Sequence, residues 1–403
     1  MKSVRYERLT APSSLFYTRL IAVLAVVAAG LGSAWFMEHN GHWVTGMDNQ
    51  TVWGMPHVFA VFLIVAASGA LNVASIGSVF GRSAYKPLGR LSGLLAIALL
   101  AGGLSVLVLD LGRPDRLIVA MTNYNFSSIF AWNIFLYTGL FGVVALYLWT
   151  LMDRSMARHS KRAGLLAFVW RLALTTGTGL IFGFLVAREA YDAAVLAPLF
   201  IAMSFAFGLA IFILVLGILY DRSGQPVGGY LVRRMGRLLA LFVAAVQYFV
   251  IVQHLTGLYA AEHTGVERFI LMDGGMITTL FWVGQVILGG LLPMALLLGS
   301  ADSLTMKRIS TASVLVIIGG LVQVYVIIIG GQAYPLELFP GMDVSSSFYD
   351  GIVQSYSPSL PEIGLGIGGF AIAAAISIVG MRVLEFIPES LGDAAVDLHH
   401  VKD

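Results

Sequence analysis

Charged residues at the end of a long apolar stretch are the first candidates for chemistry in this chain. The stretch 91–109 is followed by Asp110-Leu-Gly-Arg113-Pro-Asp115. Gly112 accepts the left-handed conformation that ends a helix, and the proline cannot continue the helical hydrogen-bond ladder. Charged groups in apolar surroundings cost free energy unless they are paired or hydrated, so Asp110 and Arg113 are candidates for function. Their spacing of three residues would also let them pair as a purely structural helix cap.

Polar and aromatic residues gather at the same level in other apolar stretches. A molecule with a polar head and an apolar tail needs aromatic rings beside its head and a proton-exchanging His or Asp beside each oxygen. A quinone fits that description. Trp132 and Tyr137 could alternatively be ordinary residues of an interfacial aromatic belt. We predict a quinone site in which Asp110, His57 and His254 exchange protons and Arg113, Trp132, Asn133, Tyr137 and Arg188 surround the quinone.

The composition defines the class of protein that must position these residues. Of the 403 residues 58% are hydrophobic and 11% are charged, with a mean hydropathy of +0.86, whereas soluble domains carry about 25% charged residues. One helical crossing of a bilayer needs about 20 apolar residues. The sequence therefore predicts an all-α integral membrane protein, one polytopic domain over 1–403, with about ten helices near 17–37, 56–80, 91–109, 129–151, 165–187, 197–219, 238–261, 276–298, 312–329 and 363–381.

Lys and Arg are distributed unevenly between the two sides of this predicted bundle. If the N-terminus is cytoplasmic, all of the 24 Lys and Arg residues except Arg113, Arg116, Arg188 and Arg268 fall on the inner side. Because basic residues are retained on the cytoplasmic side of a membrane, both termini are predicted to be cytoplasmic.

Cysteine is absent from the sequence. The protein therefore cannot hold an iron–sulfur cluster by thiolates. A haem held by two histidines needs a pair at matching depth, and only His57 and His254 fall inside predicted helices, which argues against haem. No metal site is predicted, so any electron donor or acceptor beyond the quinone must lie on another chain.

Long segments with few basic residues lie on the predicted outer side. The segment 331–362 carries Glu337, Asp343, Asp350 and Glu362 and no Lys or Arg. We expect it to pack over the bundle or to bind a partner. A solvated lid without a partner is the alternative.

A second set of polar residues lies deeper in the predicted helices and includes Asn72, Gln247, Gln285 and Gln323. These amides could support a chain of water molecules for protons, but amides in membrane helices more often bond one helix to another. No charged residue is expected at the centre of a helix. We therefore predict that protons are exchanged with the outer side.

Several motifs carry a resemblance to a known family. They are Trp53-Gly54, the Asp110–Pro114 motif, Asn123-Tyr-Asn-Phe-Ser-Ser128 with Ala131-Trp-Asn133, Gly290-Leu-Leu-Pro293 and Tyr356-Ser-Pro-Ser-Leu-Pro-Glu362. With these motifs the chain resembles the NrfD or polysulfide-reductase (PsrC-like) membrane subunits, and its ten-helix length resembles the branch with DsrP and HybB.

The resemblance implies a quinone-binding anchor subunit of a respiratory oxidoreductase complex in the bacterial inner membrane. It implies a non-covalently bound menaquinone or ubiquinone, and a periplasmic ferredoxin-like iron–sulfur subunit as partner, in sulfur metabolism for a DsrP-like protein. It places Asp110, Arg113 and Trp132 by the quinone head. Three alternatives stay open: a HybB-like hydrogenase subunit, a transporter of a small anion that uses Arg113 and Arg188, and a structural anchor without quinone chemistry.

Overall fold

The computed structural model of the protein describes residues 5–10, 13–223, 227–300, 303–336 and 352–396. Ten of the helices described are long and apolar enough to cross a membrane, which confirms the predicted all-α membrane fold. They are α1 (Ser13–Asn40), α2 (Met55–Ser78), α3 (Gly89–Leu109), α5 (Ile129–Met152), α6 (Ser160–Gly183), α7 (Leu196–Ser223), α8 (Gly229–Tyr259), the run of α10 (Met276–Thr279), η7 (Leu280–Leu291) and α11 (Leu292–Leu297), the run of α12 (Met306–Tyr325), η9 (Val326–Gly330) and α13 (Gly331–Ala333), and α14 (Leu360–Val383).

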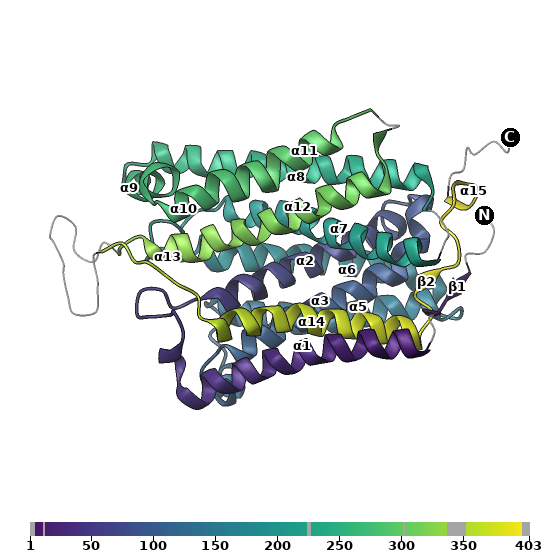
Figure 1. The fold of residues 1–403 in the computed structure, drawn as a ribbon, viewed down its shortest axis with the longest axis horizontal. Coiled ribbons are helices and arrows are strands. Elements are labelled where there is room, and N and C mark those ends of the chain that lie inside the picture. The colour runs from purple at the N-terminus through teal and green to yellow at the C-terminus, as the bar shows by residue number, and fades with distance from the viewer. Residues whose placement is uncertain (1–4, 11–12, 224–226, 301–302, 337–351, 397–403) are drawn as a thin grey trace.

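The two ends of the bundle differ in what they carry (Figure 1). At one end, β1 (Tyr6–Glu7) and β2 (Ile387–Pro388) form a short antiparallel pair in which Tyr6 lies opposite Pro388. We call this the terminal end. The distal end lies opposite, and there the chain enters α2 and leaves α3. Short elements complete the connections at the two ends: η1 (His42–Val44), η2 (Ser83–Leu88), η3 (Pro114–Arg116), α4 (Leu117–Thr122), η4 (Ala157–His159), η5 (Ala261–His263), α9 (Thr264–Arg268), η6 (Phe269–Asp273) and α15 (Asp393–Val396).

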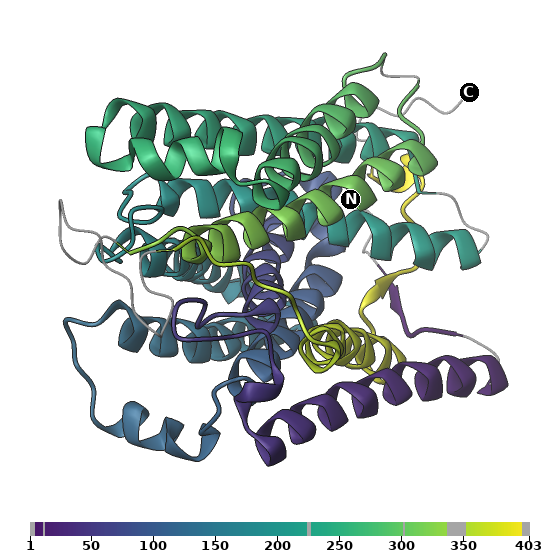
Figure 2. The same ribbon diagram turned by 60° about the vertical axis from the view of Figure 1, so that its left-hand side comes forward.

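The long helices form two groups joined by α7. The first group contains α2, α3, α5 and α6, and the second contains α8, η7, α11 and α12. Helix α7 packs against α2 on one side and against α8 and α12 on the other. Helix α1 packs against α14 and lies at the edge of the bundle (Figure 2).

Burial explains why α2 is apolar all round. In its most apolar window 94% of the residues are buried, against 17% for α1. A helix enclosed by protein on every side needs no polar face. At Gly69 a Cβ atom would lie 1.6 Å from the carbonyl oxygen of Ser204, so α2 and α7 meet backbone to backbone.

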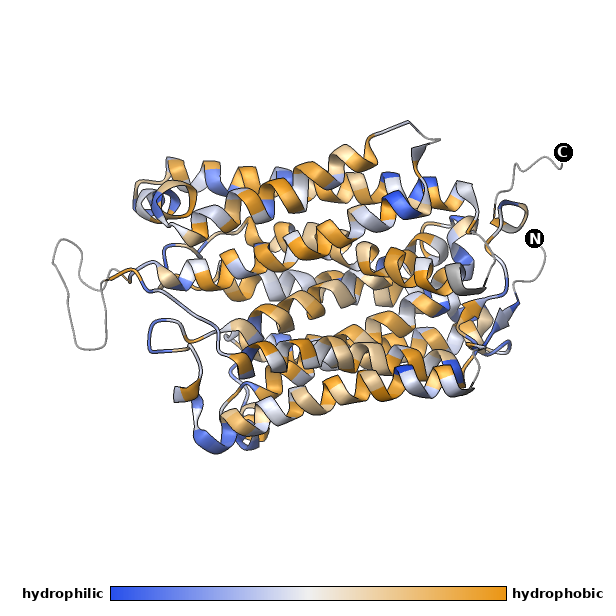
Figure 3. Cartoon of the chain, in the orientation of Figure 1, coloured by the Kyte–Doolittle hydropathy of each residue, from blue (hydrophilic) through white to orange (hydrophobic). Residues whose placement is uncertain are grey.

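Hydropathy follows the same division between helices and ends (Figure 3). The long helices are orange over most of their length, and blue residues collect near the two ends of the bundle. This is the pattern expected of helices surrounded by lipid tails.

Two expectations about the helices need correction. Helix α6 begins at Ser160 instead of Leu165 and ends at Gly183, so Arg171 lies near its middle with a fully buried side chain. The expectation that no charged residue stands at the centre of a span was therefore wrong. The same shift places Arg188 in the connection after the helix, where Asp192 turns the chain with a φ of 50°.

The segment 331–362 is described in part. Glu337, Asp343 and Asp350 lie outside the described residues. The described remainder packs on the distal end, because the hydroxyl of Tyr356 accepts the backbone N–H of Met55 in α2 at 2.7 Å.

Candidate functional site

A histidine and an aspartate from neighbouring helices meet at the distal end of the first group. His57 lies in the first turn of α2, and Asp110 is the residue at which α3 ends. His57 Nδ1 lies 2.8 Å from Asp110 Oδ2. The Asp110 side chain is fully buried and that of His57 is 16% exposed. With Nδ1 engaged by the carboxylate, Nε2 is the ring nitrogen of His57 that remains to meet a ligand.

The second carboxylate oxygen of Asp110 is positioned differently. Asp110 Oδ1 is buried and makes no hydrogen bond within the described part of the chain. A buried carboxylate oxygen without a partner carries a desolvation cost. A ligand oxygen or a proton at this position would offset that cost.

Aromatic rings flank the pair. The Trp53 ring stacks on the His57 ring, with centroids 6.0 Å apart and planes inclined by 24°. Trp53 also contacts Phe130 of α5 and Phe182 of α6, at centroid distances of 6.3 and 5.7 Å. Trp53, just before α2, thus places a flat apolar surface beside His57, and rings from α5 and α6 pack against Trp53. Such a surface suits a planar ring.

A buried glutamine fixes the backbone of Trp53. Gln332 of α13 is fully buried. Its Oε1 accepts the backbone N–H groups of Val52 and Trp53, each at 3.0 Å, and its Nε2 donates to the carbonyl oxygen of Trp53 at 2.9 Å. The run of helix that continues α12 therefore orients the ring that stacks on His57. Gln332 was not foreseen from the sequence, although its place in a long acidic segment was visible.

A second connection holds the start of α2. The Tyr356 hydroxyl accepts the N–H of Met55 at 2.7 Å and donates to Glu362 Oε1 at 2.5 Å. Glu362, fully buried, also accepts the N–H of Gly46 at 2.8 Å. Burial and then the hydrogen bond to the Glu362 carboxylate raise the pKa of the Tyr356 hydroxyl above its ordinary value. The motif 356–362 thus connects the start of α14 to the start of α2, where His57 lies.

Arg188 fastens the loops that cover this end. Its guanidinium donates to the carbonyl oxygens of Gln50 at 2.5 Å and Gln332 at 3.1 Å. Burial lowers the pKa of the Arg188 guanidinium below its ordinary value. Arg188, which was predicted to contact the quinone, is therefore engaged with one loop carbonyl and one carbonyl of α13, and it joins two segments that lie far apart in the sequence.

Arg113 pairs with Asp115 and not, as one reading of the sequence allowed, with Asp110. The ion pair is two-pronged, both N–O distances are 2.9 Å, and both side chains are more than half exposed. The hydrogen bond raises the pKa of Arg113 and lowers the pKa of Asp115. Gly112 has a φ of +67°, so the chain turns away from α3 before Arg113 is reached. His57 takes the place beside Asp110 that the sequence suggested for Arg113.

The three predicted residues of α5 lie in different surroundings. Trp132 is 48% exposed and donates from Nε1 to the carbonyl oxygen of Phe126. Asn133 is buried and donates to the carbonyl oxygens of Ile129 and Gly177, at 2.9 and 3.0 Å. Tyr137 is buried, with its hydroxyl 3.2 Å from Thr178 Oγ1. None of these hydrogen bonds involves His57 or Asp110. The bonds from Asn133 to Gly177 and from Tyr137 to Thr178 join α5 to α6.

His254 does not join the first pair. It lies in α8, and its Nδ1 is 2.6 Å from Oε2 of Glu267 in α9. The side chains are 13% and 8% exposed. The Phe281 ring of η7 packs edge-on against the His254 ring, at a centroid distance of 4.8 Å. Among the residues that the structure describes, two histidine–carboxylate pairs are at hydrogen-bond distance, one associated with each group of helices, where the sequence predicted one cluster.

Arg171 is a buried charge that was expected near the inner surface. Its Nη2 donates to Oδ1 of Asn72 at 2.9 Å, and its guanidinium carbon lies 4.8 and 5.0 Å from the ring centroids of Phe168 and Phe205. Its Nε and Nη1 have no hydrogen-bond partner in the described residues. This arrangement joins α6 to α2 and α7. The signal that could have found it was the helical register of Arg171 with Thr175 and Thr178.

The chemistry available at the distal end of the first group is proton exchange beside a flat apolar surface. A carboxylate and an imidazole in direct contact can hold and pass a proton. No cluster of three or more potential metal ligands occurs within the residues that the structure describes.

Comparison with known proteins identifies relatives over most or all of the chain. The chain is 27% identical to an Hdr-like menaquinol oxidoreductase integral membrane subunit of Archaeoglobus fulgidus, over 98% of this chain and all of the relative. It is 22% identical to the C subunit of the selenate reductase of Mesobacillus selenatarsenatis, over 91% of this chain and 93% of the relative. It is 25% identical to the C chain of the polysulfide reductase of Wolinella succinogenes, over 62% of this chain and 83% of the relative. A family described as polysulphide reductase, NrfD, matches residues 43–335, and the chain belongs to this family of helical membrane proteins.

Proposed function

We propose that the chain is the quinone-binding subunit of a membrane oxidoreductase complex. The observation that carries this proposal is the contact of 2.8 Å between His57 Nδ1 and Asp110 Oδ2, with Trp53 stacked on the histidine. Reduction of a quinone to a quinol takes up two electrons and two protons. The pair would supply or accept protons at the quinone oxygens, through Nε2 of His57 and Oδ1 of Asp110.

The ring and tail of a quinone match the surroundings of the pair. Trp53, Phe130 and Phe182 offer flat apolar surface for the ring. Exposed apolar residues of α5, among them Phe130 and Phe135, are 45% and 42% exposed and would meet the membrane. A tail could leave the site along that face. Menaquinone is the first choice, because one relative is named a menaquinol oxidoreductase subunit.

Electrons must come from, or go to, another chain. The sequence has no cysteine, and we propose an iron–sulfur subunit at the distal end as the partner. The exposed segment with η3 and α4, from Pro114 to Thr122, follows Asp110 closely along the chain and would form part of that interface. Cross-links from the partner should fall at the distal end, in 110–128 and in the described parts of 331–362. Cross-links confined to the terminal end would contradict the assigned site.

The proposal also includes the membrane in which the complex lies and its ultimate electron donor or acceptor. We propose a bacterial inner membrane and an ultimate donor or acceptor that is a sulfur compound, as in DsrP-like subunits. One relative is named for polysulfide, which supports a sulfur compound, and another is named for selenate. Identification of the subunits that co-purify with a tagged chain would assign the complex.

The experiment that tests the site is the substitution Asp110→Asn in the isolated complex. The variant keeps the shape of the side chain but removes the carboxylate. Because general acid–base groups contribute about 10²–10⁴-fold to a rate, menaquinol oxidation should slow by at least about 100-fold. Turnover at the wild-type rate would refute the proposal.

Asp153→Asn is the matched control for this experiment. Asp153 follows α5 at the terminal end and is exposed, so its substitution should leave quinol turnover unchanged. Loss of assembly in Asp110→Asn would be recognised by gel filtration. In that case affinity for a fluorescent quinone analogue, measured on Trp53→Leu, provides the second test, because loss of the stacked ring should weaken binding.

A further inference from the structure

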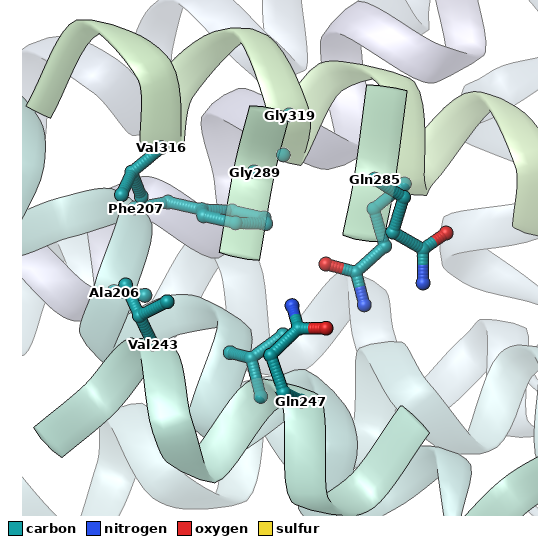
Figure 4. A pocket seen from close by; sticks show the side chains of 11 residues that line it. Ala206, Phe207, Val243, Gln247, Gln285, Gly289, Val316 and Gly319 are labelled. Carbon is teal, nitrogen blue, oxygen red and sulfur yellow. The ribbon is translucent and has the colours of Figure 1, made fainter. Parts of the chain in front are cut away.

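Two small polar cavities lie one after the other between α7 and the second group of helices. The first, of about 20 Å³, is bordered by Gln253, His254, Gln285 and Gln323. The second, of about 10 Å³, is bordered by Gln247 and by the same Gln285 and Gln323. Figure 4 shows the amides of Gln247 and Gln285 turned toward the same space. The shared glutamines make the two cavities neighbours along one line.

This line runs from the distal end toward the middle of the bundle. Gln247 and His254 both lie in α8, seven residues apart. Residues at this spacing share a helix face and are separated by about 10 Å along the axis. His254 lies near the distal end of α8, which finishes at Tyr259. The cavities therefore extend about two helical turns inward from the second histidine–carboxylate pair.

Unpartnered polar atoms line the cavities. Gln285 Oε1 and Gln323 Nε2 are buried, one an acceptor and the other a donor, and neither has a hydrogen-bond partner in the described residues. Buried polar groups are nearly always satisfied by protein or by ordered water. A water needs roughly 10–15 Å³ and two to four polar partners. Each cavity has about the room for one water, and the glutamines offer the partners.

The helices around the cavities are irregular. Each of the three π-helical segments that the structure describes contributes to the first cavity: Ile270 comes from η6, Gln285 from η7, and Val326 and Ile327 from η9. Such segments are rare and occur frequently at functional sites. Amides that only bonded one helix to another would not need a widened backbone or open space, so helix bonding alone does not explain this arrangement.

At the distal end of the two cavities lies the pair His254–Glu267, whose geometry depends on Gly257. A Cβ atom at Gly257 would lie 2.2 Å from Glu267 Oε1. The absence of a side chain there lets the Glu267 carboxylate lie against α8 and reach His254 at 2.6 Å. Either member of the pair can hold a proton.

We propose that His254 and Glu267 form a second proton-exchange site, and that water in the two cavities relays protons between this pair and the mid-bundle cavity, where the water beside Gln247 holds the proton and the amide only accepts a hydrogen bond from it. Only protons move: each water donates one proton to its neighbour as it accepts another. The proposal goes beyond the quinone site and does not depend on it, because the two pairs lie in different groups of helices.

The charged groups near this pair that the structure describes are engaged elsewhere. The exposed Arg268 pairs with Asp273, His263 lies 3.7 Å from the exposed Glu262, and His263 Nδ1 contacts the carbonyl oxygen of Glu189. Among the described residues of α7, α10, η7, α12 and η9, no charged side chain borders either cavity. The pair is therefore the charged group that the cavity waters would meet.

Infrared difference spectroscopy on the full chain in lipid nanodiscs tests the proposal. On a change from acid to alkaline pH, the wild type should lose a carboxylic C=O band that shifts in D₂O, and Glu267→Gln should lack that band. Glu262→Gln is the matched control, because its side chain lies close by in the sequence but is 80% exposed, and it should keep the band. An identical carboxylic band in wild type and Glu267→Gln would overturn the proposal.

A second measurement tests the water. Weakly hydrogen-bonded, exchangeable water O–H bands in the wild type should be lost when Gln285 and Gln323 are both replaced by Leu. Gln354→Leu, outside the cavities, is the control. Unchanged water bands would overturn the proposed path even if Glu267→Gln does not fold. Binding of a quinone analogue to the same variants separates this result from the fate of the quinone site, since it should match the wild type.

Discussion

The two histidine–carboxylate pairs differ in what surrounds them, and that difference separates their uses. Both are buried pairs at the distal end, with N–O distances of 2.8 and 2.6 Å. His57 is stacked on Trp53, which in turn contacts Phe130 and Phe182. His254 borders a cavity lined by amides and meets one ring edge-on. The same two functional groups can thus serve a flat organic ligand in one place and water in the other.

The pairs also differ in how their carboxylates are held. Asp110 stands where a long helix ends, and its Oδ1 has no hydrogen-bond partner among the described residues. Glu267 lies in a five-residue helix and is accommodated by the missing side chain of Gly257. The first carboxylate can accept a ligand, whereas the second is enclosed between two helices.

The largest expected difference between the pairs is in quinol turnover. His57→Asn should lower turnover of the complex by about 10²–10⁴-fold, because it removes one of the two proton-exchanging groups. His254→Asn should leave affinity for a quinone analogue at the wild-type value, because His254 bonds to Glu267 and packs on Phe281, away from the first pair. The measurement is analogue titration and steady-state kinetics of both variants. An equal loss of affinity for the quinone analogue in His57→Asn and His254→Asn would show that the two pairs do not differ in quinone binding.

Gly257→Ala should disrupt the second pair alone. The new methyl group would lie 2.2 Å from Glu267 Oε1, and such overpacking costs about 1–3 kcal/mol. The apparent Tm of the chain should fall, and the carboxylic band of Glu267 should shift.

Gly142→Ala is the control for this effect, since nothing lies within 4 Å of a Cβ atom at Gly142 in α5. Alanine exceeds glycine in helix propensity by about 1 kcal/mol, so this variant should be as stable as the wild type or more so. A rise in Tm for Gly257→Ala would show that Glu267 is not packed as described.

Alkaline pH should loosen the loops over the first pair. The pKa of Tyr356 is raised in the folded chain, so its stabilising contribution is fully present below the unfolded pKa of about 10. It is lost as the pH rises through the folded pKa, because the unfolded chain ionises first. Proteolysis between α1 and α2 should therefore accelerate at alkaline pH. Tyr356→Phe should be more sensitive to protease at neutral pH and should show less acceleration.

The smallest effect is expected at Arg113. Its ion pair with Asp115 is exposed, and exposed pairs contribute little to stability. Arg113→Ala should keep the Tm and the quinol turnover of the wild type. A loss of turnover comparable to that of Asp110→Asn would restore the role in the quinone site that the sequence suggested for this arginine.

The sequence predicted the helices well because each must present about 20 apolar residues to a bilayer. The helices observed begin and end within a few residues of the predicted ones in most cases, with the starts of α6, α8 and α12 as exceptions. Basic residues such as Arg162 and Arg233 lie in these first turns, where a long side chain can reach the membrane surface while the helix continues. Hydropathy therefore placed the helix starts too late.

Which side chains meet was decided by the tertiary structure. His57 and Asp110 were both visible as candidates, but nothing in the order of residues says that the start of α2 faces the end of α3 at hydrogen-bond distance. The partner of His254 was not foreseen, because Glu267 lies on a short helix after the span. Gln332 and Tyr356, which fix Trp53 and the start of α2, come from segments about 280 and 300 residues away along the chain.

The sequence by itself determined that the chain is a bundle of membrane helices with its polar residues concentrated at certain levels, because apolar length and the cost of charge in lipid are local properties. Only the tertiary structure divided those polar residues into two pairs, because the division depends on which helices pack together. Backbone contact at Gly69 joins α2 to α7. Helix α7 then separates the group that holds His57 from the group that holds His254.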